Sequence, residues 1–206
     1  KGRGRVYRIN EDYMRFIKSE LDEFDLIGKI EGRGLYEQLG YKVSPNDINP
    51  DGSVNYNNAD LIATKGDEQI LIETEVKRNN GWGCTNKSVT IPQRKSKYIK
   101  KGIEYRHIVV KEDRTELIVI RGEVLLKCFD SVGHKSIPTK NRSPTPDDKD
   151  YVETEHGCRL VKKFVDRKGI IEEDVFLDIA FKYCSKFKII VPGKLYKLIK
   201  KAELFK

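Results

Sequence analysis

Two consecutive strand-like segments constrain the fold of this chain more than any other feature. Residues 58–62 read Asn-Ala-Asp-Leu-Ile, and after a short polar turn residues 70–77 read Ile-Leu-Ile-Glu-Thr-Glu-Val-Lys. Side chains alternate between the two faces of a strand, so Glu73, Glu75 and Lys77 must share one face. Unpaired charges are costly to bury, so three charges on one side of a central strand need partners or a bound ion. The pattern therefore predicts a functional site.

A simpler interpretation is that these charges form the solvated face of an edge strand, because such alternation is common. Three neighbouring features argue against it. Asp60 lies in the same predicted hairpin, a helical segment carrying Glu31 and Glu37 precedes the hairpin, and a strongly basic segment follows it. Together these features favour a site.

The order of these segments resembles a known family. A helical segment ends in Leu-Gly-Tyr-Lys-Val at residues 39–43, followed by Asp-Leu-Ile-Ala at 60–63 and Leu-Ile-Glu-Thr-Glu-Val-Lys at 71–77. Over about residues 27–125 this arrangement is similar to the core of the PD-(D/E)XK nucleases, which include restriction endonucleases, archaeal Holliday-junction resolvases and small phage nucleases. The resemblance implies a restriction-endonuclease-like core and hydrolysis of DNA phosphodiester bonds.

The resemblance also implies roles for individual residues. In the family, an Asp and the acid of a Glu-x-Lys motif hold a divalent metal ion, and the Lys assists the attacking water. These roles fall on Asp60, Glu75 and Lys77, with the backbone carbonyl of Val76 as a further metal ligand. Glu75 is preferred to Glu73 because it has the required spacing to Lys77, and Glu73 is expected to support the site.

A Glu on the first helix of the core often completes the site in this family. Glu31 is the first choice here and Glu37 the alternative. A hard cation with oxygen ligands can both place a water molecule and stabilise charge on a phosphate. The expected cofactor is therefore Mg²⁺, with Mn²⁺ as a substitute.

The charge of the chain agrees with a nucleic-acid partner. The sequence holds 40 Lys and Arg against 32 Asp and Glu, a formal net charge of +8, and a basic excess favours polyanions. Residues 86–101 contain no acid. We expect the basic side chains of this segment to contact phosphates, although a solvated helix face is the alternative. They are Lys87, Arg94, Lys95, Lys97, Lys100 and Lys101.

The cysteines and the apolar segments exclude other classes of protein. The four cysteines show no Cys-x-x-Cys spacing, so a zinc site is not expected. No apolar run reaches the length of a membrane span, and residues 1–8 lack the apolar core of a signal peptide. We therefore expect an intracellular protein without membrane segments, cytoplasmic in a prokaryotic or phage context.

The remaining pattern predicts an α/β fold. Helical spacing of apolar residues indicates helices at 11–24 and 26–39, and runs rich in Ile and Val indicate strands at 105–110 and 116–121. The glycines in the second helix are expected to let it approach a sheet closely. With the hairpin, these elements predict a mixed central sheet of four or five strands flanked by helices.

A change in composition divides the chain. Residues 136–150 are rich in Pro, Thr, Ser, Asn and Asp and are expected to form a linker or exposed loop. The nuclease core with its N-terminal helices would then cover 1–135, and a basic helical C-terminal region would cover 151–206. Within that region, 173–187 and 194–205 are predicted to be amphipathic helices.

These observations together favour a metal-dependent DNA endonuclease. One site cuts one strand, so double-strand cleavage would require two copies and a homodimer is expected. A structure-selective nuclease such as a Holliday-junction resolvase, a noncatalytic DNA-binding protein and an RNA-processing nuclease remain alternatives.

Overall fold

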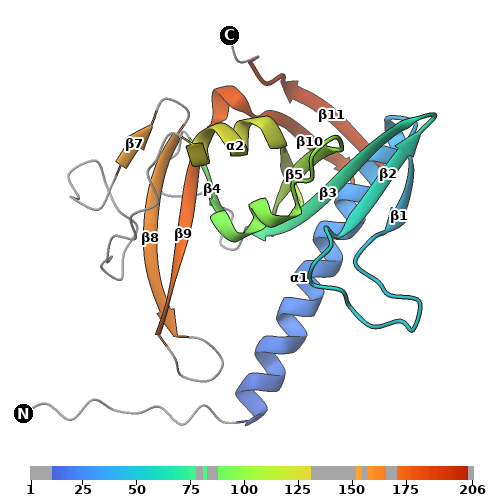
Figure 1. The fold of residues 1–206 in the computed structure, drawn as a ribbon. Helices are drawn as coiled ribbons and strands as arrows, with labels where there is room; N and C mark the ends of the chain where they lie inside the picture. The colour runs from blue at the N-terminus through green and yellow to red at the C-terminus, as the bar shows by residue number, and fades with distance from the viewer. Residues whose placement is uncertain are drawn as a thin grey trace, which may run out of the picture.

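The computed structural model describes residues 11–77, 81–82, 88–130, 152–154, 157–165 and 171–203. Figure 1 shows one long helix, a short helix and two β-sheets. The helices are α1 (Glu11–Gln38) and α2 (Gly122–Asp130), with 3₁₀ turns η2 (Gln93–Tyr98) and η3 (Phe181–Tyr183). The strands are β1 (Lys42–Pro45), β2 (Leu61–Lys65), β3 (Glu68–Lys77), β4 (Ser88–Pro92), β5 (Glu104–Lys111), β6 (Glu116–Arg121), β7 (Val152–Thr154), β8 (Gly157–Val165), β9 (Ile171–Ala180), β10 (Ser185–Val191) and β11 (Leu195–Lys200).

The main sheet has seven strands in the order β1-β2-β3-β5-β6-β10-β11. β3 and β5 are parallel, and the other neighbouring strands are antiparallel. Helix α1 contacts β3 and β5 in the middle of the sheet and also β1 and β11 at its two edges. The sheet must therefore curl around the helix, and Figure 1 shows this half-barrel shape around the C-terminal half of α1.

Two glycines of α1 make this close approach possible. A Cβ atom at Gly28 would lie 2.9 Å from the hydroxyl oxygen of Thr74 on β3, and one at Gly34 would overlap the carbonyl of Gly193 between β10 and β11. The expectation that glycines allow the helix to approach the sheet is confirmed.

Separate hydrophobic cores lie on the two faces of the main sheet. On one face, Leu35 of α1 packs with strand residues such as Ile72. On the other face, Leu71 and Val109 pack with α2, η2 and a second sheet that includes Ile179. This second sheet has four antiparallel strands in the order β4-β9-β8-β7. Because side chains alternate along β3, Glu73, Glu75 and Lys77 share the second face with Leu71.

The predicted α/β fold, a restriction-endonuclease-like core of four or five strands flanked by helices, is wrong. The sheet is mixed, but it has seven strands and a single long helix against it, and strands cover much of its other face. The two predicted N-terminal helices are one continuous helix. The predicted hairpin at 60–77 and the strands at 105–110 and 116–121 are confirmed.

The predicted C-terminal helical region is also wrong. Residues 173–187 form part of β9, then η3 and the start of β10, and most of 194–205 belongs to β11 and the residues after it. Leu177 and Ile179 are both buried, which is the alternation of a strand. Pro192 and Gly193 lie in the turn that joins β10 to β11, where Gly193 has a φ of 70°. They therefore connect the strands of a hairpin and do not precede a helix.

The predicted linker at 136–150 lies outside the described residues, so the domain boundary stays a prediction. Each of the two sheets contains strands from before and from after this segment, because β10 pairs with β6 and β9 pairs with β4. None of the helices in the described part of the chain is long and apolar enough to span a membrane.

Candidate active site

The β2–β3 hairpin decides which acid lies beside Asp60. The two strands are joined by a tight turn at Gly66, with a φ of 59°, and pair in register from Lys65 with Glu68 to Leu61 with Ile72. The next position along the ladder brings Asp60 opposite Glu73. Residues opposite each other in an antiparallel pair point to the same face, so the two carboxylates meet there.

The Asp60 side chain is held by the neighbouring strand. Its Oδ2 atom accepts hydrogen bonds from the backbone N–H of Thr74 at 2.7 Å and from the Thr74 hydroxyl at 2.6 Å. The residue is only 8% exposed. Burial raises the pKa of Asp60 above its usual range, although the hydrogen bonds from Thr74 and the charge of Lys95 oppose this shift.

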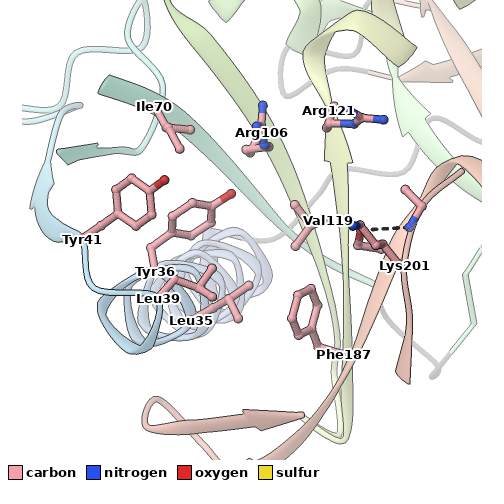
Figure 2. A pocket seen from close by; sticks show the side chains of 12 residues that line it. Leu35, Tyr36, Leu39, Tyr41, Ile70, Arg106, Val119, Arg121, Phe187 and Lys201 are labelled. Carbon is pink, nitrogen blue, oxygen red and sulfur yellow. Dashed lines mark hydrogen bonds between the residues drawn. The ribbon is translucent and has the colours of Figure 1, made fainter. Parts of the chain in front are cut away.

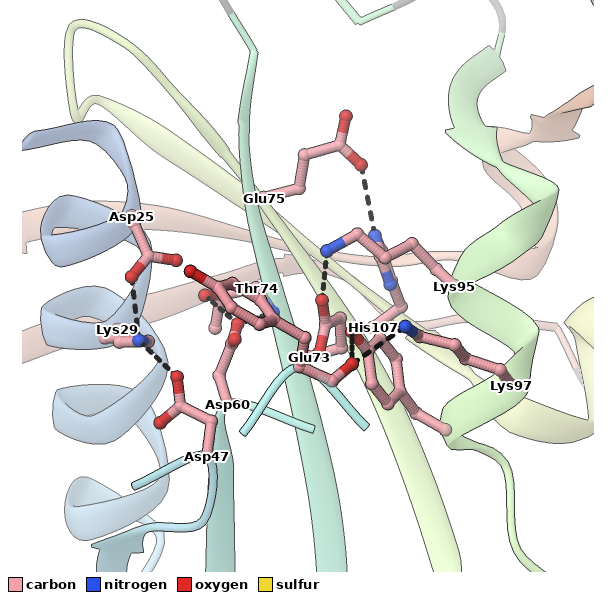
Figure 3. A network of polar contacts seen from close by, with 12 residues as sticks. Asp25, Lys29, Asp47, Asp60, Glu73, Thr74, Glu75, Lys95, Lys97 and His107 are labelled. Carbon is pink, nitrogen blue, oxygen red and sulfur yellow. Dashed lines mark hydrogen bonds and ion pairs between the residues drawn. The ribbon is translucent and has the colours of Figure 1, made fainter. Parts of the chain in front are cut away.

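Glu73 is more deeply buried and forms an ion pair with Lys95 of η2. It is 1% exposed, its Oε1 atom accepts from the Lys95 ammonium, and its Oε2 atom is buried without a hydrogen-bond partner among the described residues. Burial and then the charge of Asp60 raise the pKa of Glu73 to about 8. Burial would lower the pKa of Lys95, but Glu73 outweighs it and the pKa is raised. Figure 3 shows the cluster.

A cavity of about 280 Å³ opens beside this cluster. Asp47, from the loop before β2, also lines this cavity. Its Oδ1 atom is buried and accepts no hydrogen bond from the described residues. The ammonium group of Lys29 on α1 forms ion pairs with carboxylate oxygens of Asp47 and Asp25, each at 2.7 Å. The cavity is lined by Asp25, Asp47, Val54, Asn55, Tyr56, Asn58, Asp60, Glu73, Lys95 and Tyr98.

The chemistry of this lining fits a divalent cation. Glu73 and Asp47 both line this cavity, and each has one buried carboxylate oxygen without a hydrogen-bond partner among the described residues. Hard cations prefer such oxygen ligands. In the part of the chain that the structure describes, no three acidic, His or Cys side chains converge tightly enough to form a complete metal site. A cation here would therefore need water or substrate oxygens as well, as Mg²⁺ usually does.

Glu75 and Lys77, the predicted Glu-x-Lys pair, form a separate cluster. Glu75 pairs with Lys77 through Oε1, and its Oε2 lies 3.3 Å from Nε2 of the buried His107. Burial alone would raise the pKa of Glu75, but the charge of Lys77 and the contact with His107 lower it to about 2. The pKa of His107 is lowered by burial. The structure thus groups Asp60 with Glu73 and Lys95, apart from this pair. The side chain of Val76, by contrast, packs against the core on the α1 side.

Glu31, the predicted helical acid, lies elsewhere and is fully paired. It is 0% exposed and accepts hydrogen bonds from the guanidinium of Arg114, the backbone N–H of Gly193 at 3.0 Å and the Tyr196 hydroxyl at 2.7 Å. These bonds fasten α1 to the β5–β6 and β10–β11 turns. The alternative, Glu37, pairs with Arg33 at the surface.

The described lysines of the basic segment lie in different surroundings. Lys95 belongs to the acidic cluster, and Lys97 donates to the Tyr56 carbonyl at 2.8 Å. Lys100 and Lys101 are exposed. The other two predicted phosphate contacts, Lys87 and the side chain of Arg94, lie outside the described residues.

A second cavity, of about 300 Å³, lies on the α1 side of the main sheet (Figure 2). Its cations include Arg106 and Arg121, which are direct cross-strand partners and which also pair with Glu104 and Glu123. None of the predicted site residues lines it. Its lining consists of Leu35, Tyr36, Leu39, Tyr41, Ile70, Arg106, Val119, Arg121, Ser185, Phe187, Lys201 and Ala202.

Sequence reasoning missed two acids that line the cavity, Asp25 and Asp47, and Lys29, which pairs with both. An acid in a turn-rich loop or a Lys four residues after an Asp on a helix is common, and neither signals a site by itself. The folded chain alone brings them next to Asp60.

Comparison with known proteins gives no further assignment. The chain matches no protein-family model, and it shows no significant similarity to a curated protein or to a solved structure.

Proposed function

We propose that this protein is a metal-dependent nuclease that hydrolyses phosphodiester bonds in DNA, with Asp60, Glu73 and Lys95 as its reacting groups. One observation carries the proposal: two buried carboxylates lie side by side at a cavity that a lysine also lines, and one of them has an oxygen without a partner among the described residues. Such an arrangement costs stability, and strongly shifted carboxyl pKa values in a cleft are typical of functional sites.

Asp60 and Glu73 would hold the cation, and Asp47 offers a further oxygen at the same cavity. Mg²⁺, or Mn²⁺ in its place, would supply stabilisation of the charge on the phosphate and would lower the pKa of a bound water. Thr74 orients Asp60 through two hydrogen bonds to one oxygen. The carboxylate is thereby fixed before any substrate arrives.

Lys95 takes the part that the resemblance assigned to Lys77. Its pKa is raised by Glu73, so it carries a positive charge at neutral pH. It can orient Glu73 and stabilise negative charge that develops on the phosphate oxygens. Lys95 lines the cavity and Lys77 does not, which supports this assignment. A DNA substrate is favoured by the net charge of +8, and a homodimer stays a prediction.

Cleavage of supercoiled plasmid tests the proposal. We expect nicking or linearisation with Mg²⁺ or Mn²⁺ and none with EDTA. Asp60→Asn should lower the rate by at least about 100-fold, since it removes a group that acts in the transition state. Asp67→Asn is the matched control: it removes the same charge from an exposed turn residue of the same hairpin, and it should leave the rate unchanged.

Other substrates separate the alternatives. Cleavage of a four-way junction but not of plasmid would assign a structure-selective nuclease, and cleavage of RNA alone would assign an RNA-processing enzyme. If plasmid, junction and RNA all stay intact with both metals, the proposed hydrolysis is wrong, and retained DNA binding would then identify a noncatalytic binding protein.

A further inference from the structure

Lysines occupy matching positions on four of five neighbouring strands of the main sheet. Lys77 of β3 pairs in register with Lys111 of β5, whose ammonium bonds Glu116 of β6 at 2.6 Å. Glu116 pairs in register with Lys188 of β10, and Lys188 with Lys197 of β11. These five residues, named here the lysine row, thus cross the sheet from its central strand to the β11 edge.

The lysine row lies on the face that carries the candidate active site. Residues in register on neighbouring strands point to the same face, and Lys77 shares its face with Glu75 and Glu73. The row begins on the strand that holds both glutamates. Four steps between strands at about 4.8 Å each give it a length of about 19 Å.

The row concentrates positive charge at an energetic cost. Like charges directly opposite each other destabilise a sheet, and here Lys77 faces Lys111 and Lys188 faces Lys197. Glu116 is the acid of the row, and it already bonds Lys111 and, at 2.8 Å, Lys186.

The two outer lysines of the row are free to meet a ligand. Lys188 and Lys197 are exposed and have no ion-pair partner among the described residues. The edge of the row therefore offers unneutralised charge to solvent, which suits a polyanion.

Resting on the proposed function, we propose that the lysine row binds the phosphate backbone of the nucleic-acid substrate and directs the strand from the β11 edge toward the candidate active site. The charges repeat along a line, as backbone phosphates do. A row of about 19 Å spans roughly five phosphates of one B-DNA strand at 3.4 Å per phosphate. The exposed lysines, Lys188 and Lys197, can each meet a phosphate, which gives a salt-dependent affinity, and Lys111 and Lys77 continue the line of positive charge toward the candidate active site.

Trp82 is a natural reporter of this surface. It is the single tryptophan of the chain, and its ring centroid lies 5.3 Å from Nζ of Lys111 and 5.9 Å from Nζ of Lys186. Its inner side packs against the core, with Phe181 edge-on at 6.4 Å. Nucleic acid on the lysine row would change the surroundings of these ammonium groups, so the emission of Trp82 should change on binding.

The test is the binding of a fluorescent DNA duplex in EDTA, measured by anisotropy at increasing salt. Lys188→Gln with Lys197→Gln removes two charges from the row. Lys100→Gln with Lys101→Gln removes two charges from exposed positions in the segment that the sequence favoured. The first double variant should bind about 10-fold more weakly and lower the salt slope by about 2, at about 0.9 per lost phosphate contact. The second should bind within about 2-fold of wild type.

Equal losses in the two double variants, or a larger loss for the Lys100 and Lys101 variant, would overturn the proposal. Thermal melts show whether each variant is folded, and the dependence of Trp82 emission on duplex concentration gives an independent affinity. EDTA prevents metal-dependent cleavage, so binding is scored separately from the proposed function. If the protein binds DNA through the row but never cleaves it, only the proposed nuclease activity is contradicted. If it cleaves DNA but the row variants bind normally, only the proposed role of the row is contradicted.

Discussion

Glu73 and Glu75 lie two residues apart on the same face of β3, yet their electrostatic environments are opposite. The pKa of Glu73 is raised to about 8, and that of Glu75 is lowered to about 2. Burial disfavours both charges. Glu73 has Asp60 beside it and one lysine partner, whereas the largest influences on Glu75 after burial are Lys77 and His107.

The difference favours Glu73 over Glu75 as a ligand of the proposed metal ion. Both oxygens of Glu75 have partners, so its charge is already compensated. One oxygen of Glu73 has none among the described residues. Strand alternation puts both acids on one face, but the neighbours that the fold supplies give them different roles. Matched variants of the two clusters test the assignment to Glu73.

Variants of the two lysines should differ most in their rate of cleavage. Lys95→Met should lower the initial rate of plasmid nicking in Mg²⁺ by about 100-fold or more, because the ammonium acts on developing charge at the phosphate. Lys77→Met, which removes the same charge, should lower it by less than about 10-fold. The reverse order would restore the Glu-x-Lys pair predicted from spacing.

The same two variants should differ in stability. At pH 9, where Glu73 with its pKa of about 8 is ionised, Lys95→Met leaves this carboxylate buried without its ion-pair partner and should reduce the free energy of unfolding by about 3 kcal/mol. Lys77→Met affects a pair in which Glu75 is 20% exposed and keeps His107, so a loss of about 1 kcal/mol is expected. Urea denaturation in EDTA at pH 9, where both glutamates are ionised, measures both. Equal losses would mean that the two ion pairs are equivalent.

Glu73 should make the metal-free protein less stable at high pH. Its folded pKa is raised from 4.5 to about 8, so its favourable contribution is complete below about pH 4.5 and is lost as the pH rises through about 8. Glu73→Gln should therefore melt at a higher temperature than wild type at pH 9 and nearly equally at pH 5. Thermal melts in EDTA test this, and a variant that gains nothing at pH 9 would contradict the raised pKa.

Glu75 should give the opposite dependence. Its folded pKa is lowered from 4.5 to about 2, so its contribution is present above about pH 4.5 and is lost as the pH falls through about 2. Glu75→Gln should melt at a lower temperature than wild type at pH 7, and the gap should close toward pH 2. If the melting temperatures of the two glutamine variants change with pH in the same way, the opposite pKa shifts of Glu73 and Glu75 are contradicted.

The pairing of Asp60 with Glu73 was within reach of the sequence. Gly66 and Asp67 form a two-residue connection between strand-like segments, and such a turn fixes the register of a hairpin. Counting back from Lys65 opposite Glu68 places Asp60 opposite Glu73. The spacing to Lys77 favours Glu75 instead, because a Glu-x-Lys motif carries no information about which residue lies opposite Asp60.

The rest of the site could not be derived in this way. Lys95 reaches Glu73 across 22 residues of sequence, from a 3₁₀ turn that packs on the sheet. Its partner is decided by tertiary packing, and the sequence showed it only as one charge in a basic run. Glu31 looked like a site residue because an acid on a helix carries no sign of its partners, Arg114 and Tyr196.

The fold was predicted well where the signal is local and poorly where strands pair over long distances. β5 and β6 are neighbouring runs of β-branched residues, and both were found. The segment at 173–187 has charges and apolar residues that also fit a helical period. Pairing with β4 and β6 decides in favour of strands, and neither contact is visible in a local window.

The central question is whether Glu73 belongs to the reacting cluster. Calorimetry can answer it by comparing Mn²⁺ binding at pH 8 to wild type, Glu73→Gln and Glu75→Gln. The two variants remove the same charge from positions two residues apart. We predict that Glu73→Gln weakens Mn²⁺ binding by about 100-fold or more and that Glu75→Gln changes it by less than about 3-fold. Loss of binding in Glu75→Gln with retention in Glu73→Gln would contradict the account and move the metal to the cluster of Glu75 and Lys77.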